Sequence, residues 1–108
     1  MTAEEVDALF DVLADPTRRH VVRLLGARPR RAGELARAAG VSPPVISRHL
    51  RILLAAGVVA DERVPGDARL RVFHLRREPI AALQAWLDQL QAQWTEQLGS
   101  FKRYVEDR

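Results

Sequence analysis

Apolar residues recur at helical spacing through most of the chain. An amphipathic helix is predicted over residues 1–13 by apolar positions at i, i+3, i+4 and i+7, which are Val6, Leu9, Phe10 and Leu13. A second helix is expected to begin at Asp15-Pro16, because aspartate caps a helix N-terminus well and proline suits the first helical position. It should end at Gly26, and its apolar face consists of Val21, Val22, Leu24 and Leu25.

Two more helices follow a short basic loop, "ARPRR". The third covers "AGELARAAG", with Gly40 suited to the left-handed position past its end and with an inward face of Leu35, Ala36 and Ala39. The fourth opens on Pro43 and Pro44, which cost little there because the amides of a first helical turn have no intrahelical partner. Ser42 is expected to cap this helix, which closes on Gly57.

The fourth helix has two chemically different faces. The first is apolar and should be buried, and it consists of Ile46, Leu50, Leu53 and Leu54. The second is rigid at its start, short in its side chains and basic in its middle, and it consists of Pro44, Ser47, Arg48 and Arg51. Such a face could enter a DNA groove. An ordinary solvated helix surface is the alternative interpretation.

The segment "VVADERVPGDARLRVFHL" contains two β-branched runs and predicts a β-hairpin. The two runs are joined by Pro65-Gly66-Asp67-Ala68, which indicates a longer loop than the tightest hairpins have. Phe73 and Leu75 share a face that can pack inward. Three arginines gather near the tip of the hairpin: Arg63, Arg69 and Arg71.

The last helix is expected to open at Pro79 and to carry one long apolar stripe. The stripe advances in steps of three and four residues through Ile80, Leu83, Leu87, Leu90, Trp94, Leu98, Phe101 and Val105. Such a helix is roughly 40 Å long, whereas a compact chain of this size has a radius of gyration of only about 13 Å. Either a second copy covers the stripe or the helix breaks at Gly99, and we favour a homodimer with the first helix alongside.

Charge is distributed unevenly along the chain. Residues 1–15 carry five acids and no base, and residues 78–108 carry five acids and three bases. Residues 16–77 carry 14 arginines against four acids, a net charge of +10. Arginine pairs with phosphate in a two-pronged geometry, so this central block suits the phosphate backbone of a nucleic acid, and an ordinary solvated surface is the alternative interpretation.

Composition excludes several classes of protein. The 108 residues correspond to one domain, and the absence of cysteine excludes disulfides and thiolate metal sites. No apolar run is long enough to cross a membrane, and the acidic N-terminus lacks the features of a secretory signal, so we expect a cytoplasmic protein without a membrane partner. No catalytic motif or glycine-rich phosphate loop occurs, so we expect no enzyme and no cofactor.

The order of four helices, a hairpin and a last helix is that of a winged helix-turn-helix dimer. The segments "LADPTRRHVVRLL", "GELARAAGVSPPVISRHLRILLAAGVV" and "RLRVFHL" resemble the ArsR/SmtB family of bacterial transcriptional repressors over residues 9–77. The resemblance implies an α+β fold, mostly helical with a small hairpin, which dimerises through its first and last helices. It also implies one DNA-binding domain over residues 1–108, with residues 1–13 and 79–107 as dimerisation helices.

The resemblance also assigns DNA-binding residues by position. The recognition helix becomes Pro43 to Ala56, and the expected DNA contacts are Ser42, Pro43, Pro44, Val45, Ser47, Arg48, His49, Arg51 and, in the wing, Arg63, Arg69 and Arg71. Arg48 is the best candidate base reader, although a phosphate contact is nearly as well supported. For His49, packing and helix-end bonding, a phosphate contact and a metal remain alternatives. The expected dimer contacts are Val6, Leu9, Phe10, Leu83, Leu87, Leu90, Trp94, Leu98 and Phe101.

The metal sites known in the family do not match this sequence. The metal-binding cysteines of the third helix would fall at Arg31, Gly33 and Ala36, none of which can bind a metal as a thiolate does. The site in the last helix needs an acid followed by histidines; Asp88 could supply the acid, but Leu90 and Phe101 occupy the histidine positions. The last helix instead resembles a metal-free branch that carries tryptophans and often represses its own gene. Trp86 and Trp94 can border one stripe, as core or dimer seam or as the lining of a small-molecule pocket.

The primary hypothesis is a homodimeric transcriptional repressor that binds an inverted-repeat operator and has no metal site of the ArsR type. The first alternative is a repressor that responds to a small molecule or to a metal held by a non-cysteine site. The second alternative is a protein-interaction module that uses the last helix. The sequence leaves open the operator, the regulated genes, the effector, and whether the protein represses or activates.

Overall fold

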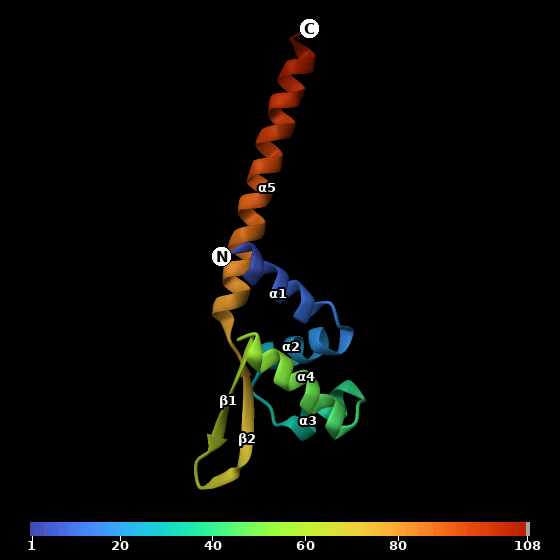
Figure 1. The fold of residues 1–108 in the computed structure, drawn as a ribbon, viewed down its shortest axis with the longest axis vertical. Helices are drawn as coiled ribbons and strands as arrows, with labels where there is room; N and C mark the ends of the chain where they lie inside the picture. Colours follow the sequence, from blue (N-terminus) through green and yellow to red (C-terminus); the bar gives the residue numbers. More distant parts are fainter. Residues whose placement is uncertain (108) are drawn as a thin grey trace.

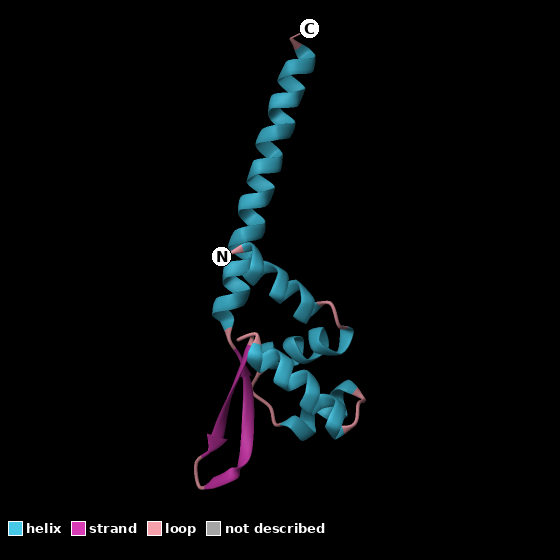
Figure 2. Ribbon diagram, viewed as in Figure 1, coloured by secondary structure: helices cyan, strands magenta, loops and turns pink. Residues whose placement is uncertain are grey.

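The computed structural model describes residues 1–107 and contains helices and one two-stranded antiparallel sheet (Figures 1 and 2). The elements follow the expected order: α1 (Ala3–Leu13), α2 (Pro16–Ala27), α3 (Ala32–Ala39), α4 (Pro43–Ala55), β1 (Val59–Val64), β2 (Asp67–Leu75) and α5 (Arg77–Glu106). The first four helices gather on one side of the hairpin, and α5 rises away from this body as a rod (Figure 1). The mostly helical fold with one small hairpin is confirmed.

Short-range signals start and stop the helices. The Asp15 carboxylate accepts a hydrogen bond from the Arg18 amide at 3.0 Å, and Pro16 takes the first position of α2. Gly40 ends α3 with φ of 68°, a left-handed conformation that glycine adopts without the steric cost of a Cβ. Thr2 and Glu5 form a capping box at the start of α1 that the sequence analysis did not identify.

The core lies where the helical body meets the base of the hairpin. It combines the apolar faces of α1 to α4 with the start of the hairpin, Phe73 of β2 and one residue of α5, Leu83. The largest fully buried side chains are Val21, Leu35, Ile46, Leu53, Val58 and Val59. In α1 the buried face is Val6, Leu9 and Val12, whereas Phe10 remains 46% exposed.

The hairpin corrects one prediction. Val64 pairs with Asp67, so the loop contains only Pro65 and Gly66 instead of the longer loop expected from the sequence. Gly66 adopts φ of 88°, and the register shifts between Arg63 and Val64. A positive φ at glycine together with this irregularity allows the chain to reverse in two residues, which the spacing of the β-branched runs does not reveal.

Helix α5 is continuous through Gly99, so the alternative of a break there is wrong. Its 30 residues correspond to about 45 Å of helix, and the chain extends 72 Å along its longest axis with a radius of gyration of 19.2 Å. Large apolar side chains are exposed along its distal part: Leu87, Trp94, Leu98, Phe101, Tyr104 and Val105. Among the residues that the structure describes, no helix is long and apolar enough to span a membrane.

Candidate nucleic-acid interface

Helix α4 presents the face that the sequence singled out. Its apolar side, Ile46, Leu50 and Leu53, is buried, and its opposite side exposes Ser42, Pro43, Pro44, Ser47, Arg48 and Arg51. Val45 is half-buried. The helix starts at Pro43 with Ser42 in the N-cap position, although the Ser42 side chain makes no capping hydrogen bond. The predicted start and the predicted N-cap residue are therefore confirmed, and the cap lacks a hydrogen bond to the Ser42 hydroxyl.

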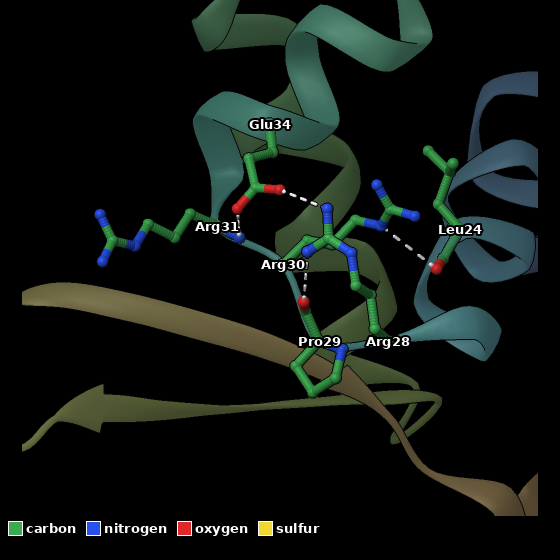
Figure 3. Close-up of polar contacts among 6 residues, drawn as sticks. All are labelled: Leu24, Arg28, Pro29, Arg30, Arg31 and Glu34. Atoms are coloured by element: carbon green, nitrogen blue, oxygen red, sulfur yellow. Dashed lines mark hydrogen bonds and ion pairs between the residues drawn. The ribbon is translucent and has the colours of Figure 1, made fainter.

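The turn before α3 is braced by its own arginines (Figure 3). Glu34 accepts hydrogen bonds from Arg28 Nη2 at 3.1 Å and from the Arg31 amide at 3.5 Å, and Arg30 Nε donates to the Leu24 carbonyl at 3.3 Å. The Arg28 side chain, followed by the Arg31 amide, lowers the pKa of Glu34. Arg28 and Arg30 thus fix the entry to α3.

The same turn is attached to the hairpin. Arg30 and Phe73 exchange two backbone hydrogen bonds, of 3.0 Å and 2.8 Å, which tie the α2–α3 connection to β2. Helices α3 and α4 and strand β2 therefore hold a fixed relation to one another. An open groove of about 1000 Å³ lies between them, and its basic lining residues are Arg31, Arg37, Arg51, Arg69 and Arg71.

The arginines of the hairpin differ in how much they are held by the protein itself. Arg71 pairs with Asp61 at 2.7 Å and lies 5.0 Å from the Phe73 ring centroid, a cation–π distance. Arg63 donates to the Ala68 carbonyl, and Arg69 pairs with Asp67 at 3.4 Å while its side chain stays 92% exposed. Arg71 is thus braced in place, whereas Arg69 extends into solvent.

Two basic residues of the groove escaped the sequence analysis. Arg31 and Arg37, at the two ends of α3, line the groove together with Ser47 and Arg51 of α4. In the sequence only the positive charge of these two residues could have pointed to DNA binding. No pattern of neighbouring residues shows that α3 lines the same groove as α4. Arg48 and Arg51 make no ion pair among residues 1–107. Both guanidinium groups can therefore donate hydrogen bonds to an external partner without breaking an internal ion pair.

His49 lies on α4 but turns partly into the protein. Its Nδ1 atom is 3.3 Å from Nη1 of Arg18, a residue of α2. The side chain is half-buried, in keeping with the packing role considered for it, and its predicted phosphate contact remains a prediction. Among the described residues, no group of three or more histidines and acids is placed to hold a metal.

The predicted dimer residues divide into two groups. Val6, Leu9 and Leu83 are only 3%, 4% and 8% exposed within one protomer, so they have little area left for a partner. The remaining members keep exposed apolar surface, apart from Leu90, which is half-buried: Phe10, Leu87, Trp94, Leu98 and Phe101. The structure thus narrows the candidate interface to the distal face of α5 and to Phe10.

Helix α1 is joined to α5 at the base of the rod. The rings of Phe10 and Trp86 meet edge to face, with centroids 6.1 Å apart and an angle of 74° between their planes. Trp86 is half-buried and packs against the core, whereas Trp94 is 56% exposed. The two tryptophans therefore have different surroundings, although the sequence placed both along one stripe.

Helices α3 and α4 form a helix-turn-helix, and the hairpin that follows them lines the same basic groove. This arrangement defines a winged helix-turn-helix DNA-binding protein. Residues 15–61 match the family model described as "Bacterial regulatory protein, arsR family". The chain is 37% identical over 105 residues to the HTH-type transcriptional regulator Rv2034 of Mycobacterium tuberculosis, covering 97% of this chain and 92% of that protein. The chain belongs to the ArsR family of DNA-binding transcriptional regulators.

Other relatives agree in fold and class. The transcriptional repressor SdpR of Bacillus subtilis is 42% identical over 55 residues, which cover 51% of this chain and 61% of that protein. Among solved structures, an ArsR-like transcriptional regulator from Rhodococcus sp. RHA1 superposes with a TM-score of 0.82 at 26% identity, covering 93% of this chain and 92% of that one. The family is one of transcriptional regulators and not of enzymes, as the sequence predicted.

Proposed function

We propose that this regulator is a homodimeric repressor that binds an imperfect inverted repeat through α4 and the hairpin wing, and that it has no metal site of the ArsR type. The observation that carries the proposal is the groove framed by α3, α4 and β2, which gathers five arginines beside the exposed face of the recognition helix. Guanidinium groups bind phosphate oxygens in a two-pronged geometry and can also bind guanine O6 and N7 together.

The DNA contacts fall into two classes by position. Ser47 and Arg48 stand on the exposed face of α4, which favours them as readers of base edges. Arg31, Arg37 and Arg69 line the groove beside that helix, and this placement suits contacts to the phosphate backbone. His49 belongs to the proposed surface through a phosphate contact. The remaining members of the surface are Ser42, Pro43, Pro44, Val45, Arg51, Arg63 and Arg71.

Dimerisation is proposed from the length and exposure of α5. Trp94, Leu98 and Phe101 are 56%, 69% and 66% exposed, and their spacing places them along one side of the helix. An isolated soluble protein rarely exposes so continuous an apolar strip, because its burial stabilises an assembly by about 25 cal/mol per Å². A second copy with α5 against α5 also brings two recognition helices together, as an inverted repeat requires.

The proposal is tested by selecting duplexes from a random-sequence library with the wild-type protein and measuring their binding by fluorescence anisotropy. We expect enriched inverted repeats whose half-site centres are about 34 Å apart, one turn of duplex, or a multiple of that. Affinity should fall steeply between about 50 and 200 mM salt, because binding releases counterions from phosphates. Equal affinity for the enriched duplex and a scrambled duplex would contradict the proposal.

The alternatives give different results in the same preparation. A protein-interaction module is favoured if light scattering finds a monomer at micromolar concentration, because the α5 strip would then be left for another protein. A site that responds to a metal or to a small molecule is favoured if a divalent cation or a bound metabolite changes operator affinity. If neither a divalent cation nor a metabolite changes operator affinity, the result supports a regulator without an effector. Its occupancy of the operator would then depend only on the concentration of the regulator itself.

A further inference from the structure

One arginine of α2 reaches two other helices at once. The Arg18 guanidinium donates from Nε to the Val12 carbonyl at 2.7 Å and from Nη2 to the Asp11 carbonyl at 3.2 Å, and its Nη1 lies 3.3 Å from His49 Nδ1. The first two contacts hold carbonyls in the last turn of α1, and the Asp11 carbonyl also accepts a hydrogen bond from the Ala14 amide at 3.3 Å. The third contact reaches the recognition helix, 31 residues further along the chain.

The geometry of the third contact joins a side chain of α2 to a half-buried side chain of the recognition helix. A guanidinium group offers only donors, so in a hydrogen bond between the two groups Arg18 donates and Nδ1 of His49 accepts. The same guanidinium that binds the end of α1 therefore also contacts the His49 ring.

Helix α1 connects this contact to the proposed dimer interface. It begins beside α5 and runs away from it to the turn that leads into α2 (Figure 1). Phe10, in the last turn of α1, meets the Trp86 ring of α5. In the same turn Arg18 binds the Asp11 and Val12 carbonyls while it also contacts His49. Helix α1 thus connects the rod that pairs the two subunits with the helix that enters the DNA.

We propose that Arg18 is a positioning residue for operator binding, which holds α4 at a set place relative to the dimer rod by tying the end of α1 to His49. This inference rests on the proposed dimeric repressor. A dimer binds both half-sites well only if its two recognition helices have the correct separation. Without Arg18, α4 remains folded on the core through Ile46, Leu50 and Leu53, but its position relative to α1 is less restricted.

The neighbouring Arg19 provides a matched control. Its Nη1 atom donates to the carbonyls of Leu13 and Ala14, at 2.8 Å and 2.9 Å, so it also binds the end of α1. Within residues 1–107 its side chain makes no hydrogen bond or ion pair with α4. Arg18→Gln and Arg19→Gln each remove one positive charge and hydrogen bonds to the end of α1, and only Arg18→Gln removes the link to the recognition helix.

The experiment compares three affinities for each full-length variant: for the duplex enriched by the wild-type protein, for the same duplex with one base pair inserted between its half-sites, and for a scrambled duplex. We expect Arg18→Gln to weaken binding to the enriched duplex about tenfold more than Arg19→Gln does. The two variants should bind the scrambled duplex equally. Arg18→Gln should also discriminate less than the wild type against the inserted base pair.

A double-mutant cycle with His49→Leu assigns the effect to this pair. In the His49→Leu background, Arg18→Gln should cost no more operator affinity than Arg19→Gln does. If Arg18→Gln does not fold by circular dichroism, Arg18→Lys is compared with Arg19→Lys, because lysine keeps the charge but cannot reach both partners with a planar fork. The same difference between the two positions is expected.

Equal operator affinity and equal spacing discrimination in the Arg18 and Arg19 variants would overturn the inference and leave the proposed function intact. Failure of the wild-type protein to enrich any duplex would instead overturn the proposed function, and the inference with it.

Discussion

Arginine supplies nearly all of the positive charge, and the structure separates these arginines by what they do within the protein. Arg28 and Arg30 brace the turn before α3, and Arg71 is held by Asp61 and by the Phe73 ring. Arg48 and Arg51 are exposed on α4 and make no ion pair within the described residues. A side chain without an internal partner can bind DNA at no cost in stability, so the second group is the better source of recognition.

Replacing Arg48 and Arg69 should separate base reading from phosphate binding. We expect Arg48→Ala to cost about 1 to 3 kcal/mol of operator affinity and to relax sequence preference, because bidentate contacts to a base are lost. Arg69→Ala should weaken binding to the enriched and scrambled duplexes alike, since phosphates carry no sequence information. Anisotropy titrations with both duplexes measure this, and identical behaviour of the two variants would contradict the division.

Asp15 gives a prediction about stability and pH. Its hydrogen bond from the Arg18 amide is the main cause that lowers the pKa of this carboxyl below 3.8, so the ionised form stabilises the folded state. This contribution is complete above the unfolded pKa and is lost as the pH falls through the lower folded value. We expect Asp15→Ala to lower the free energy of unfolding by about 1 kcal/mol at neutral pH, measured by urea denaturation.

The matched control for this prediction is Asp15→Asn. Asparagine keeps an acceptor for the cap but has no carboxyl group to titrate. Its stability should therefore stay close to that of the wild type at neutral pH and should lose the part of the acid dependence that Asp15 causes. An unchanged acid dependence in this variant would exclude Asp15 as its source.

At the scale of single elements, two glycines have opposite roles. Gly99 lies inside α5, where an added Cβ would be 3.6 Å from the flexible end of Arg103, an ordinary contact. Gly40 ends α3 with φ of 68°, a conformation that side-chain-bearing residues adopt at a cost. Gly99 therefore weakens the helix that contains it, whereas Gly40 terminates a helix.

We expect Gly99→Ala to raise the free energy of unfolding by about 0.5 to 1 kcal/mol, because alanine restricts the unfolded chain and favours the helix. Gly40→Ala should lower it by about 1 to 2 kcal/mol. Thermal and urea denaturation of both variants give the comparison. Destabilisation by Gly99→Ala would indicate that α5 is not helical at this position in solution.

At the scale of the whole molecule, the protein is a small folded body with a long helix projecting from it (Figure 2). Within α5 only Leu83 is buried, at 8% exposure, whereas the distal half exposes a row of large apolar side chains. Most of the stability of a helix in a protein comes from tertiary packing of its apolar face, and the distal half of α5 has no such packing within the described residues of one protomer. The exposed row is therefore the part of the molecule that supports the proposed dimer.

A charge placed on the exposed strip should prevent this association. We expect Leu98→Glu to shift the protein from dimer to monomer in light scattering at micromolar concentration, because the interface would bury an unpaired carboxylate. Gln97→Glu adds the same charge one residue away at a polar exposed position and should leave the dimer intact. Equal dimer populations in both variants would exclude the Leu98 side of α5 from the interface.

The sequence predicted the features that depend on neighbours along the chain. Asp15, Pro16 and Gly40 set the ends of α2 and α3, and the spacing of Ile46, Leu50 and Leu53 gave the buried side of α4. Capping, backbone preference and amphipathic spacing act within a few residues, so these elements could be predicted from local patterns. The class of protein followed from their order and from the resemblance of residues 9–77 to the ArsR/SmtB family, and the basic character of residues 16–77 supported it.

Only the tertiary structure decided which distant side chains meet. It brought Arg31 and Arg37 to the groove beside α4, paired Arg71 with Asp61, and placed Arg18 against His49. It also assigned Val6, Leu9 and Leu83 to the core of one subunit and left Leu98 and Phe101 outside it. Hydrophobic spacing shows that a residue faces an apolar surface, but whether that surface belongs to the same subunit depends on packing between elements far apart in sequence.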